Sequence, residues 1–165
     1  MNLNGKTAAS VGFKIAAVIA CAGRLELLEH RALASIKKQQ LCPEVLIIVA
    51  DGPAKGDVEA NIRSILAGLW PDRSSGPEII VLGNRRTQQS ASGAWNSALD
   101  ELCRRFGDMA RGWYVAVLDD DDAWAPGHLI ACQQAAEKTD ADMIIAGLVR
   151  HEEAADEGRA QSIPV

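Results

Sequence analysis

The sequence predicts an α/β fold: an open, mainly parallel sheet with helices on both faces. Short apolar runs recur at regular intervals along the 165 residues, and segments whose apolar residues lie three and four apart separate them. Alternating strands and helices of this kind form parallel sheets with right-handed crossovers. A composition of 48% apolar and 24% charged residues is sufficient for one domain with an ordinary core.

Five apolar runs are predicted to be strands buried on both faces of the sheet. Each is short, continuous and mostly β-branched, which is typical of a parallel sheet. They cover residues 14–20, 45–50, 78–82, 113–118 and 142–149. Helical spacing of apolar residues predicts four helices between the strands, near residues 27–36, 58–66, 94–102 and 127–138.

We expect residues 14–149 to form the domain. Residues 1–13 are predicted to be an N-terminal extension, and residues 150–165 a mobile tail or the point at which a longer protein was cut. The tail is charged and ends in Ile163-Pro164-Val165 without completing another helix or strand. The sequence therefore predicts a truncated fold.

The composition excludes several classes of protein. A net charge of −5 argues against coating nucleic acid or binding an anionic membrane, and no apolar stretch reaches the roughly 20 residues that a membrane span needs. The four cysteines are widely spaced, as is typical of reduced thiols: Cys21, Cys42, Cys103 and Cys132. We therefore expect a cytoplasmic protein with no nucleic-acid partner and no membrane span.

Four consecutive aspartates, Asp119 to Asp122, are the most informative feature of the sequence. They follow a predicted buried strand, so four like charges collect where the chain leaves the core. Two carboxylates about 4 Å apart repel each other by roughly 4 kcal/mol at an effective dielectric constant of about 20. Mg²⁺ or Mn²⁺ would offset that repulsion, because both prefer carboxylate oxygens. The alternative is a solvated acidic turn that also caps the next helix.

Polar residues follow the other predicted strands as well. Ligands of open α/β sheets bind beyond the carboxyl ends of the strands, so polar residues collected there indicate a site. Such segments follow the first four strands, at residues 21–24, 51–53, 83–86 and 119–122. The sequence contains neither a G-x-G-x-x-G dinucleotide motif nor a P-loop, and the acidic run lacks the glycine and glutamate of an EF-hand loop.

These segments together carry a resemblance to a known family. In order and residue type they resemble the family 2 glycosyltransferases, whose fold is GT-A, a Rossmann-like sheet. The resemblance covers about residues 14–149 and is most specific where aspartates precede a tryptophan, a proline and a leucine. The matching segments are Val18–Ala20, Ile47–Gly52, Gly83–Asn84, Ala94–Asn96 and Val117–Leu129.

The resemblance implies transfer of a sugar, with inversion, from a nucleotide-diphosphate sugar donor to an unidentified acceptor. Asp119 and Asp121 match the D-x-D motif that holds Mn²⁺ or Mg²⁺ against the diphosphate, with Asp121 favoured as the direct ligand. Alternation supports this pairing, because every second residue of an extended segment points to the same side. Asp122 is then expected to have a structural role, either at the N-terminus of the next helix or as a carboxylate that supports the metal ligands.

The resemblance also implies a nucleotide site. Asp51 matches the acidic residue that contacts the base, and Asp120 matches an acidic position that faces the sugar-nucleotide. The loop after the first strand would frame the nucleotide. The nucleotide-binding residues expected on this basis are Ala22, Gly23, Arg24, Asp51, Asn84 and Asp120.

The sequence departs from the family pattern in several places. Ala50 replaces the first of two acidic residues after the second strand, and Trp95 stands where an arginine is usual. Arg85 and Arg86 either supply that positive charge or are solvated loop residues. Cys21 is expected to be a buried filler, since no histidine is placed to activate it. The general base and the acceptor-binding part of the family are not found in the sequence.

Two other functions stay open on the sequence. A nucleotidyltransferase can use a similar sheet with metal-binding aspartates, but it usually has a glycine-rich basic loop after the first strand, and this chain has one glycine and one arginine there. A non-catalytic binding or assembly module would keep the aspartates as a relic or a cap. The sequence does not identify the sugar, the base, the acceptor or the oligomeric state.

Overall fold

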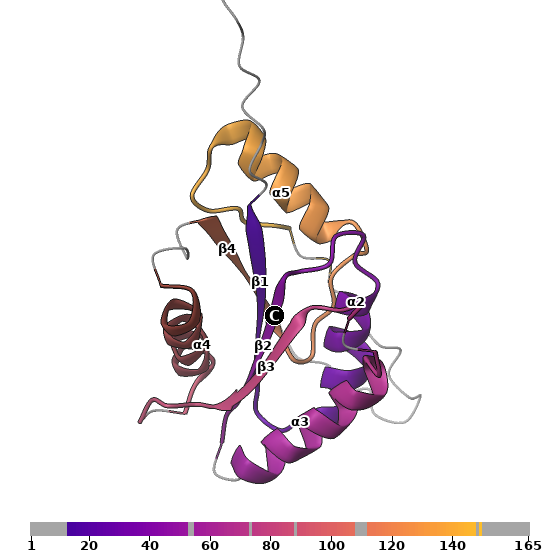
Figure 1. The fold of residues 1–165 in the computed structure, drawn as a ribbon, viewed down its shortest axis with the longest axis vertical. Coiled ribbons are helices and arrows are strands. Elements are labelled where there is room, and N and C mark those ends of the chain that lie inside the picture. Colours follow the sequence, from indigo (N-terminus) through magenta and orange to yellow (C-terminus); the bar gives the residue numbers. More distant parts are fainter. Residues whose placement is uncertain are drawn as a thin grey trace, which may run out of the picture.

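The computed structural model describes residues 13–52, 55–72, 74–87, 89–107, 112–147 and 149. The predicted tail lies outside these residues, and so does the predicted N-terminal extension apart from Phe13. Figure 1 shows the sheet between helices, with the strands running in one direction.

The described strands form one all-parallel sheet, which confirms the predicted α/β class. The order is β3-β2-β1-β4, and the strands are β1 (Lys14–Cys21), β2 (Val45–Ala50), β3 (Glu78–Gly83) and β4 (Trp113–Asp119). The helices are α1 (Leu25–Leu27), the π-helix η1 (Leu28–Leu33), α2 (Ala34–Lys37), α3 (Lys55–Leu69), α4 (Ala91–Phe106) and α5 (His128–Thr139). Each of the four predicted helices is therefore present, the first as a continuous run from α1 through η1 to α2.

Helices cover both faces of the sheet, as predicted. α4 packs Ala94, Ala98 and Leu102 against one face, whereas α1, η1, α2 and α3 cover the other (Figure 1). Successive residues of β1 enter opposite cores, Val18 on the side of α4 and Ile19 on the other. All residues of β2 are buried, which explains its continuous apolar sequence.

Both ends of α4 carry local sequence signals. Ser90 is the N-cap, and its hydroxyl oxygen accepts a hydrogen bond from the backbone N–H of Gly93 at 3.0 Å. Gly107 follows the helix with a φ of 53°, a conformation that glycine adopts at little cost. These signals set the two ends of α4 at Ala91 and Phe106.

The register of the sheet brings the strand ends together. Ala20 of β1 pairs with Asp119 of β4. Cys21 of β1 pairs with Ala50 of β2, which pairs in turn with Gly83 of β3. The polar segments that follow these residues therefore meet at one edge of the sheet, as the sequence predicted.

The predicted fifth strand is wrong, because residues 142–147 and 149 form no strand. The segment starts beside the beginning of β4, where the hydroxyl of Tyr114 donates to the carbonyl of Ala141. Its apolar side chains are then uncovered, with exposed fractions of 73%, 83% and 76% for Met143, Ile145 and Val149. The apolar run indicated a buried strand, but pairing with β4 would stabilise it only if both of its faces were also covered.

α5 lies across the amino end of the sheet, beyond the start of β1 in Figure 1. The side chain of Gln133 donates to the carbonyl of Phe13, just before β1, at 3.1 Å. The helix ends at Asp140, whose φ of 51° is the left-handed conformation common at helix C-termini. Within the part of the chain that the structure describes, no helix has both the length and the apolar character needed to cross a bilayer.

Trp70 and Gly76 make a close contact at the amino edge of the sheet. Trp70 is 7% exposed and belongs to the core on the side of α3. A Cβ atom at position 76 would lie 2.5 Å from Cδ1 and 2.9 Å from Nε1 of the Trp70 ring. Glycine is therefore required at position 76 by packing.

Gly76→Ala is expected to lower the free energy of unfolding by about 1–3 kcal/mol, because the new methyl group must displace the Trp70 ring. Gly68→Ala in α3 is the matched control, since no heavy atom lies within 4 Å of the Cβ position there. That change should be neutral or stabilise the protein by up to about 1 kcal/mol, because alanine favours helix. Urea unfolding followed by tryptophan fluorescence measures both, and equal effects would contradict the packing argument.

Candidate functional site

Asp51 follows β2 at the carboxyl edge of the sheet and is 8% exposed. Its backbone N–H donates to the carbonyl of Cys21, at the end of β1, at 2.8 Å. Its Oδ1 accepts two hydrogen bonds, from the N–H of Gly52 at 3.0 Å and from Nδ2 of Asn84 at 2.9 Å. Gly52 has a φ of 107°, which turns the chain back onto the carboxylate. Among the described residues, Oδ2 has no hydrogen-bond partner, so this oxygen can accept from a ligand.

Asn84 ties the end of β3 to this carboxylate. It is 3% exposed, and its backbone N–H donates to the carbonyl of Ala50 at 2.8 Å. Its Oδ1 lies 2.9 Å from the backbone nitrogen of Arg86 and 3.1 Å from Oγ of Ser97 in α4. Sequence reasoning missed Ser97, because a serine between buried alanines of a helix resembles an ordinary small core residue.

The aspartate run forms a turn instead of continuing β4. β4 ends at Asp119, and the N–H of Asp122 donates to the carbonyl of Asp119 at 3.2 Å. The predicted alternation of the four side chains is therefore wrong, since Asp120 and Asp121 both pair with the guanidinium group of Arg24. A turn can bring consecutive side chains to one cation, whereas an extended strand would place them on opposite faces.

Asp120 is completely buried and anchors the loop after β1. Its carboxylate accepts hydrogen bonds from the backbone N–H of Ala22, at 3.3 Å, and from Arg24. Gly23, between these two residues, has a φ of 98°, which lets the loop turn toward β4. A buried carboxylate needs such partners, because burying an unpaired charge is costly. The structure thus gathers Ala22, Gly23 and Arg24 around Asp120, and their contact with a nucleotide stays a prediction.

The aspartate cluster keeps an excess of negative charge. Burial raises the pKa of Asp119, and the charges of Asp122, Asp121 and Asp120 raise it further. Arg24 acts in the opposite direction and is the weakest of these influences. Arg24 pairs with Asp120 and Asp121, and Nη1 of Arg31 lies 3.3 Å from the carbonyl of Asp121. Two guanidinium groups beside four carboxylates leave negative charge in excess, and a divalent cation would relieve the remaining repulsion.

Helix α2 and the residues that follow it hold the loop after the aspartates. The backbone N–H of Trp124 donates to Oγ of Ser35 at 3.1 Å. Gln39 contacts both this loop and the helix that follows it: its Nε2 donates to the carbonyl of Ala125 at 2.8 Å, and its Oε1 accepts from the N–H of Leu129, in the first turn of α5, at 3.1 Å. The helix that covers one face of the sheet thereby also fixes the path of this loop.

Asp122 does not lie at the N-terminus of the next helix, so the first of its two expected roles is wrong, and the second stays a prediction. α5 begins at His128 with Gly127 as its N-cap residue, and Asp122 is exposed in the preceding turn. Trp124 packs against the core and stacks on His128, with ring centroids 5.0 Å apart and an interplanar angle of 14°. Trp124 is thus a packing residue beneath the loop, and burial lowers the pKa of its neighbour His128.

Arg85 and Arg86 are paired with acids of α4. Nη2 of Arg85 lies 2.9 Å from Glu101, and Nη2 of Arg86 lies 2.6 Å from Asp100. Trp95, where the family usually has arginine, packs against the core beneath α4. Its Nε1 is buried without a hydrogen-bond partner among the described residues. In this structure the positive charge nearest the aspartates is therefore that of Arg24.

Cys21 is fully buried at the end of β1. Burial raises the pKa of its thiol to about 11, and the negative charge of Asp120 contributes in the same direction. Such a thiol is protonated at neutral pH and is a poor nucleophile. The expectation of a buried filler at this position is confirmed.

Asp119 and Asp121 fit part of a divalent-metal site. Among the described residues, no three Cys, His, Asp or Glu side chains could hold a metal ion by themselves. Mg²⁺ is often bound by one or two carboxylates, with phosphate oxygens and water completing the coordination. The side chain of Asp121 is 37% exposed, so an ion can reach it. The residues present therefore fit a site that a bound diphosphate would complete.

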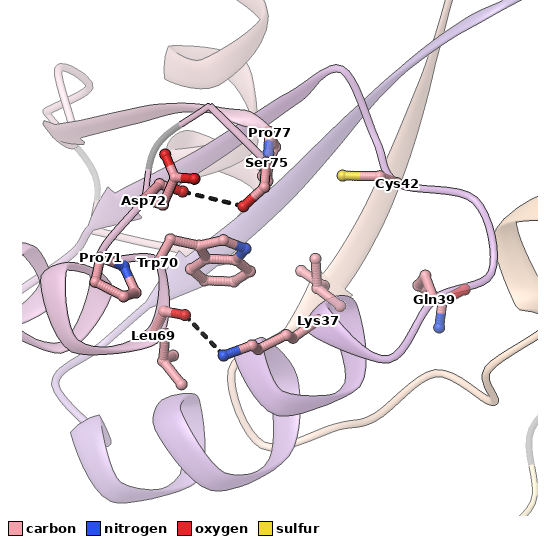
Figure 2. A pocket seen from close by; sticks show the side chains of 10 residues that line it. Lys37, Gln39, Cys42, Leu69, Trp70, Pro71, Asp72, Ser75 and Pro77 are labelled. Carbon is pink, nitrogen blue, oxygen red and sulfur yellow. Dashed lines mark hydrogen bonds between the residues drawn. The ribbon is translucent and has the colours of Figure 1, made fainter.

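A separate cleft of about 400 Å³ lies at the opposite edge of the sheet (Figure 2). It is lined by residues from the ends of α2 and α3 and from the segments before β2 and β3, among them Lys37, Cys42, Trp70 and Pro77. The ammonium group of Lys37 crosses it to donate to the carbonyl of Leu69 at 2.8 Å. None of the residues expected to bind nucleotide or metal lines this cleft, so it is not the candidate site.

Comparison with known proteins identifies the family. The family model described as Glycosyl transferase family 2 matches residues 17–164. The chain belongs to glycosyltransferase family 2. The four-stranded parallel sheet of this family 2 domain agrees with a GT-A, Rossmann-like arrangement. A search of curated proteins found no significant match.

In this glycosyltransferase family 2 domain, Glu101 ties the loop after β3 to α4. Glu101 is 3% exposed and accepts from Arg85 at 2.9 Å, from Arg104 at 2.6 Å and from Arg105 at 2.8 Å. The guanidinium groups, that of Arg104 foremost, hold the pKa of Glu101 well below its usual range. Because Arg85 directly follows Asn84, this ion-pair cluster supports the candidate site.

Glu101→Gln is expected to lower the free energy of unfolding by about 2 kcal/mol at neutral pH, because its charge-assisted hydrogen bonds are weakened or lost. A carboxyl group with a depressed pKa stabilises the folded state above its unfolded pKa of about 4.3, and this contribution is lost as pH falls toward the folded value. The difference between the wild type and the variant should therefore be constant near neutrality and shrink below about pH 4. Urea unfolding at a series of pH values measures it.

Asp100→Asn is the matched control on the same helix. Asp100 pairs with Arg86 at 2.6 Å, but both side chains are about half exposed. Its loss should change the free energy of unfolding by no more than about 0.5 kcal/mol. Equal losses for the two variants, or a difference for Glu101→Gln that persists unchanged into acid, would contradict the assignment of Glu101 as a buried ionic anchor.

Proposed function

We propose that the chain is the donor-binding part of a metal-dependent, inverting glycosyltransferase that uses a nucleotide-diphosphate sugar. The observation that carries the proposal is the meeting of Asp51 and the aspartate cluster at one edge of the sheet, with β1 between them. Neighbouring strands lie about 4.8 Å apart, so the ends of β2 and β4 are roughly 10 Å apart. That spacing suits a nucleoside diphosphate, in which a ribose separates the base from the phosphates. Membership of family 2 supports sugar transfer as the reaction.

Asp51 is proposed to receive an N–H group of the base. Its Oδ1 is occupied by Gly52 and Asn84, which leaves Oδ2 for the ligand. An ionised carboxylate only accepts hydrogen bonds, so it selects a donor on the base. The burial of Asp51 supports this role, because an exposed carboxylate would keep its water shell and discriminate poorly.

The loop after β1 is proposed to frame the nucleotide through Ala22, Gly23 and Arg24. The side chain of Arg24 is 49% exposed. A guanidinium group has five N–H donors, more than its contacts with Asp120 and Asp121 require. Arg24 can therefore also meet a phosphate. The burial of Asp120 supports an indirect part in donor binding, in which it holds this loop in place.

Asp119 and Asp121 are proposed to hold Mn²⁺ or Mg²⁺ together with the diphosphate. A bound cation of this kind neutralises the charge that develops on a leaving nucleoside diphosphate. The protein's own contribution is to keep two hard oxygen donors at the end of β4, where like charges already repel one another. Asp119 and Asp121 are not proposed to bind the acceptor or to act as the general base.

We also propose a cytoplasmic location and no nucleic-acid partner. Cys21, Cys42, Cys103 and Cys132 are all free thiols in the structure, which supports a reducing compartment. The net charge of −5 supports the absence of a polyanionic partner.

Mn²⁺ added with UDP or GDP is expected to raise the melting temperature of the protein by about 5 °C or more when the nucleotide is at roughly 100 times its Kd. A ligand that binds only the native state adds roughly 2.7 kcal/mol at that excess, and a domain of this size gains about 2–4 °C per kcal/mol. Mn²⁺ alone or nucleotide alone should give a smaller shift, because the ion and the diphosphate complete each other's site. Differential scanning fluorimetry measures each condition.

Asp121→Asn should remove most of the shift that depends on metal. Asp119→Asn should do the same while raising the melting temperature of the ligand-free protein, because one of four repelling charges is lost. Asp72→Asn is the matched control: Asp72 is exposed at the opposite edge and should keep the full shift. The absence of a shift with either nucleotide, or a full shift in Asp121→Asn, would refute the proposal.

A further inference from the structure

We infer that Asn84 and Ser97 set the nucleobase preference of this site by positioning Asp51, without touching the nucleotide themselves. The inference rests on the proposed function, in which Asp51 receives the base. It gives Asn84 an indirect role in place of the direct nucleotide contact that the family resemblance implied. It also assigns a role to Ser97, which the sequence did not single out.

The carboxamide group of Asn84 has one orientation that satisfies its neighbours. Its oxygen lies 2.9 Å from the backbone nitrogen of Arg86, which can only donate. Nδ2 therefore faces Asp51 and donates to Oδ1 at 2.9 Å. The reversed amide would set an oxygen against the carboxylate and an NH₂ group against an N–H. Both side chains are nearly buried, at 3% and 8% exposure, so water cannot replace this hydrogen bond.

Ser97 holds the carboxamide oxygen from the side of α4. It is fully buried, its Oγ lies 3.1 Å from Oδ1 of Asn84, and it accepts from the N–H of Arg85 at 3.0 Å. The hydroxyl has a single hydrogen, which it can give to Asn84 or to the carbonyl of Gly93 at 3.0 Å. When the hydrogen is given to Asn84, a continuous series of hydrogen bonds runs from α4 through Ser97 and Asn84 to Asp51.

This series of hydrogen bonds determines which carboxylate oxygen of Asp51 is open to a ligand. Asn84 and Gly52 occupy Oδ1, so the ligand meets Oδ2, which only accepts. Uracil and guanine carry a ring N–H that matches this acceptor. Cytosine and adenine present a lone pair at the equivalent ring nitrogen and would repel it. The site should therefore prefer UDP over CDP and GDP over ADP.

Isothermal titration calorimetry with Mn²⁺ tests the inference on the whole chain, using UDP, CDP, GDP and ADP. Mn²⁺ with pyrophosphate probes the phosphate part of the site alone. Asn84→Ala should weaken the preferred nucleotide about tenfold and reduce its preference over the matching poor base, since one buried hydrogen bond to a charged group is lost. Ser97→Ala should weaken it about threefold. Affinity for pyrophosphate should stay within about twofold, because neither residue acts on the phosphates.

A double-mutant cycle separates positioning from general damage. In an Asp51→Asn background, Asn84→Ala should cause no further loss of nucleotide affinity, because it acts through the Asp51 carboxylate. Ser90→Ala is the matched serine control: Ser90 caps α4 by accepting from the N–H of Gly93 at 3.0 Å and takes no part in the hydrogen bonds that link Ser97, Asn84 and Asp51. Ser90→Ala should lower the free energy of unfolding and leave both the nucleotide affinity and the base preference unchanged.

The outcomes are distinct for the inference and for the proposed function. Losses shared equally by nucleotides and pyrophosphate, or a loss that persists in the Asp51→Asn background, would overturn the inference. Unchanged base preference in both variants would overturn it too and leave the proposed function standing. A wild-type protein that binds none of the nucleotides would overturn both. If Asn84→Ala does not fold, Ser97→Ala tests the inference instead, because it removes a single oxygen atom and interrupts the same series of hydrogen bonds.

Discussion

The position of β1 between β2 and β4 is the constraint on which the rest of the structure depends. β1 is hydrogen-bonded to a parallel neighbour on each side, and its core residues are buried on both faces. A shift of one residue in either pairing would exchange the β1 side chains between the two cores, each of which is packed against different helices, so close packing opposes a slip. That register places the backbone of Asp51 against Cys21, and Asp120 against Ala22. Asp51 and the aspartate cluster therefore lie on either side of β1 at the same edge of the sheet.

Charge compensation by arginine is the second theme of the structure. Glu101 is buried and accepts hydrogen bonds from three arginines, which neutralise its negative charge. Asp120 is buried and has one arginine, which it shares with Asp121. The same device therefore produces a structural anchor in α4 and an incompletely neutralised cluster after β4. The difference is one of charge balance: four adjacent carboxylates outnumber the guanidinium groups of Arg24 and Arg31 beside them, which makes this cluster the candidate for a cation.

Most of the fold could be predicted from the sequence, because the strands of a doubly covered parallel sheet are continuous apolar runs and the helices between them keep their periodicity. The prediction of a strand at residues 142–149 was wrong, because an apolar composition does not show whether another element covers the two faces of that segment. At the candidate site, the sequence predicted that polar side chains would collect at the carboxyl edge of the sheet. The pairing of Arg24 with Asp120, by contrast, joins positions 96 residues apart and has no local signal. Ser97 was missed for the same reason, because its partner Asn84 lies on a different element.

The most direct test of the central claim is an NMR titration of the amide resonances with Mn²⁺ in the presence of UDP or GDP. Paramagnetic broadening should centre on the amides of Ala22, Gly52, Asp120 and Asp121 at the carboxyl edge. The amides of Glu44 and Gly76, about 20 Å away at the amino edge for strands of this length, should broaden least at substoichiometric Mn²⁺. Broadening centred on the cleft beside Trp70, or spread without a centre, would contradict the assignment of the donor site to the ends of β1, β2 and β4.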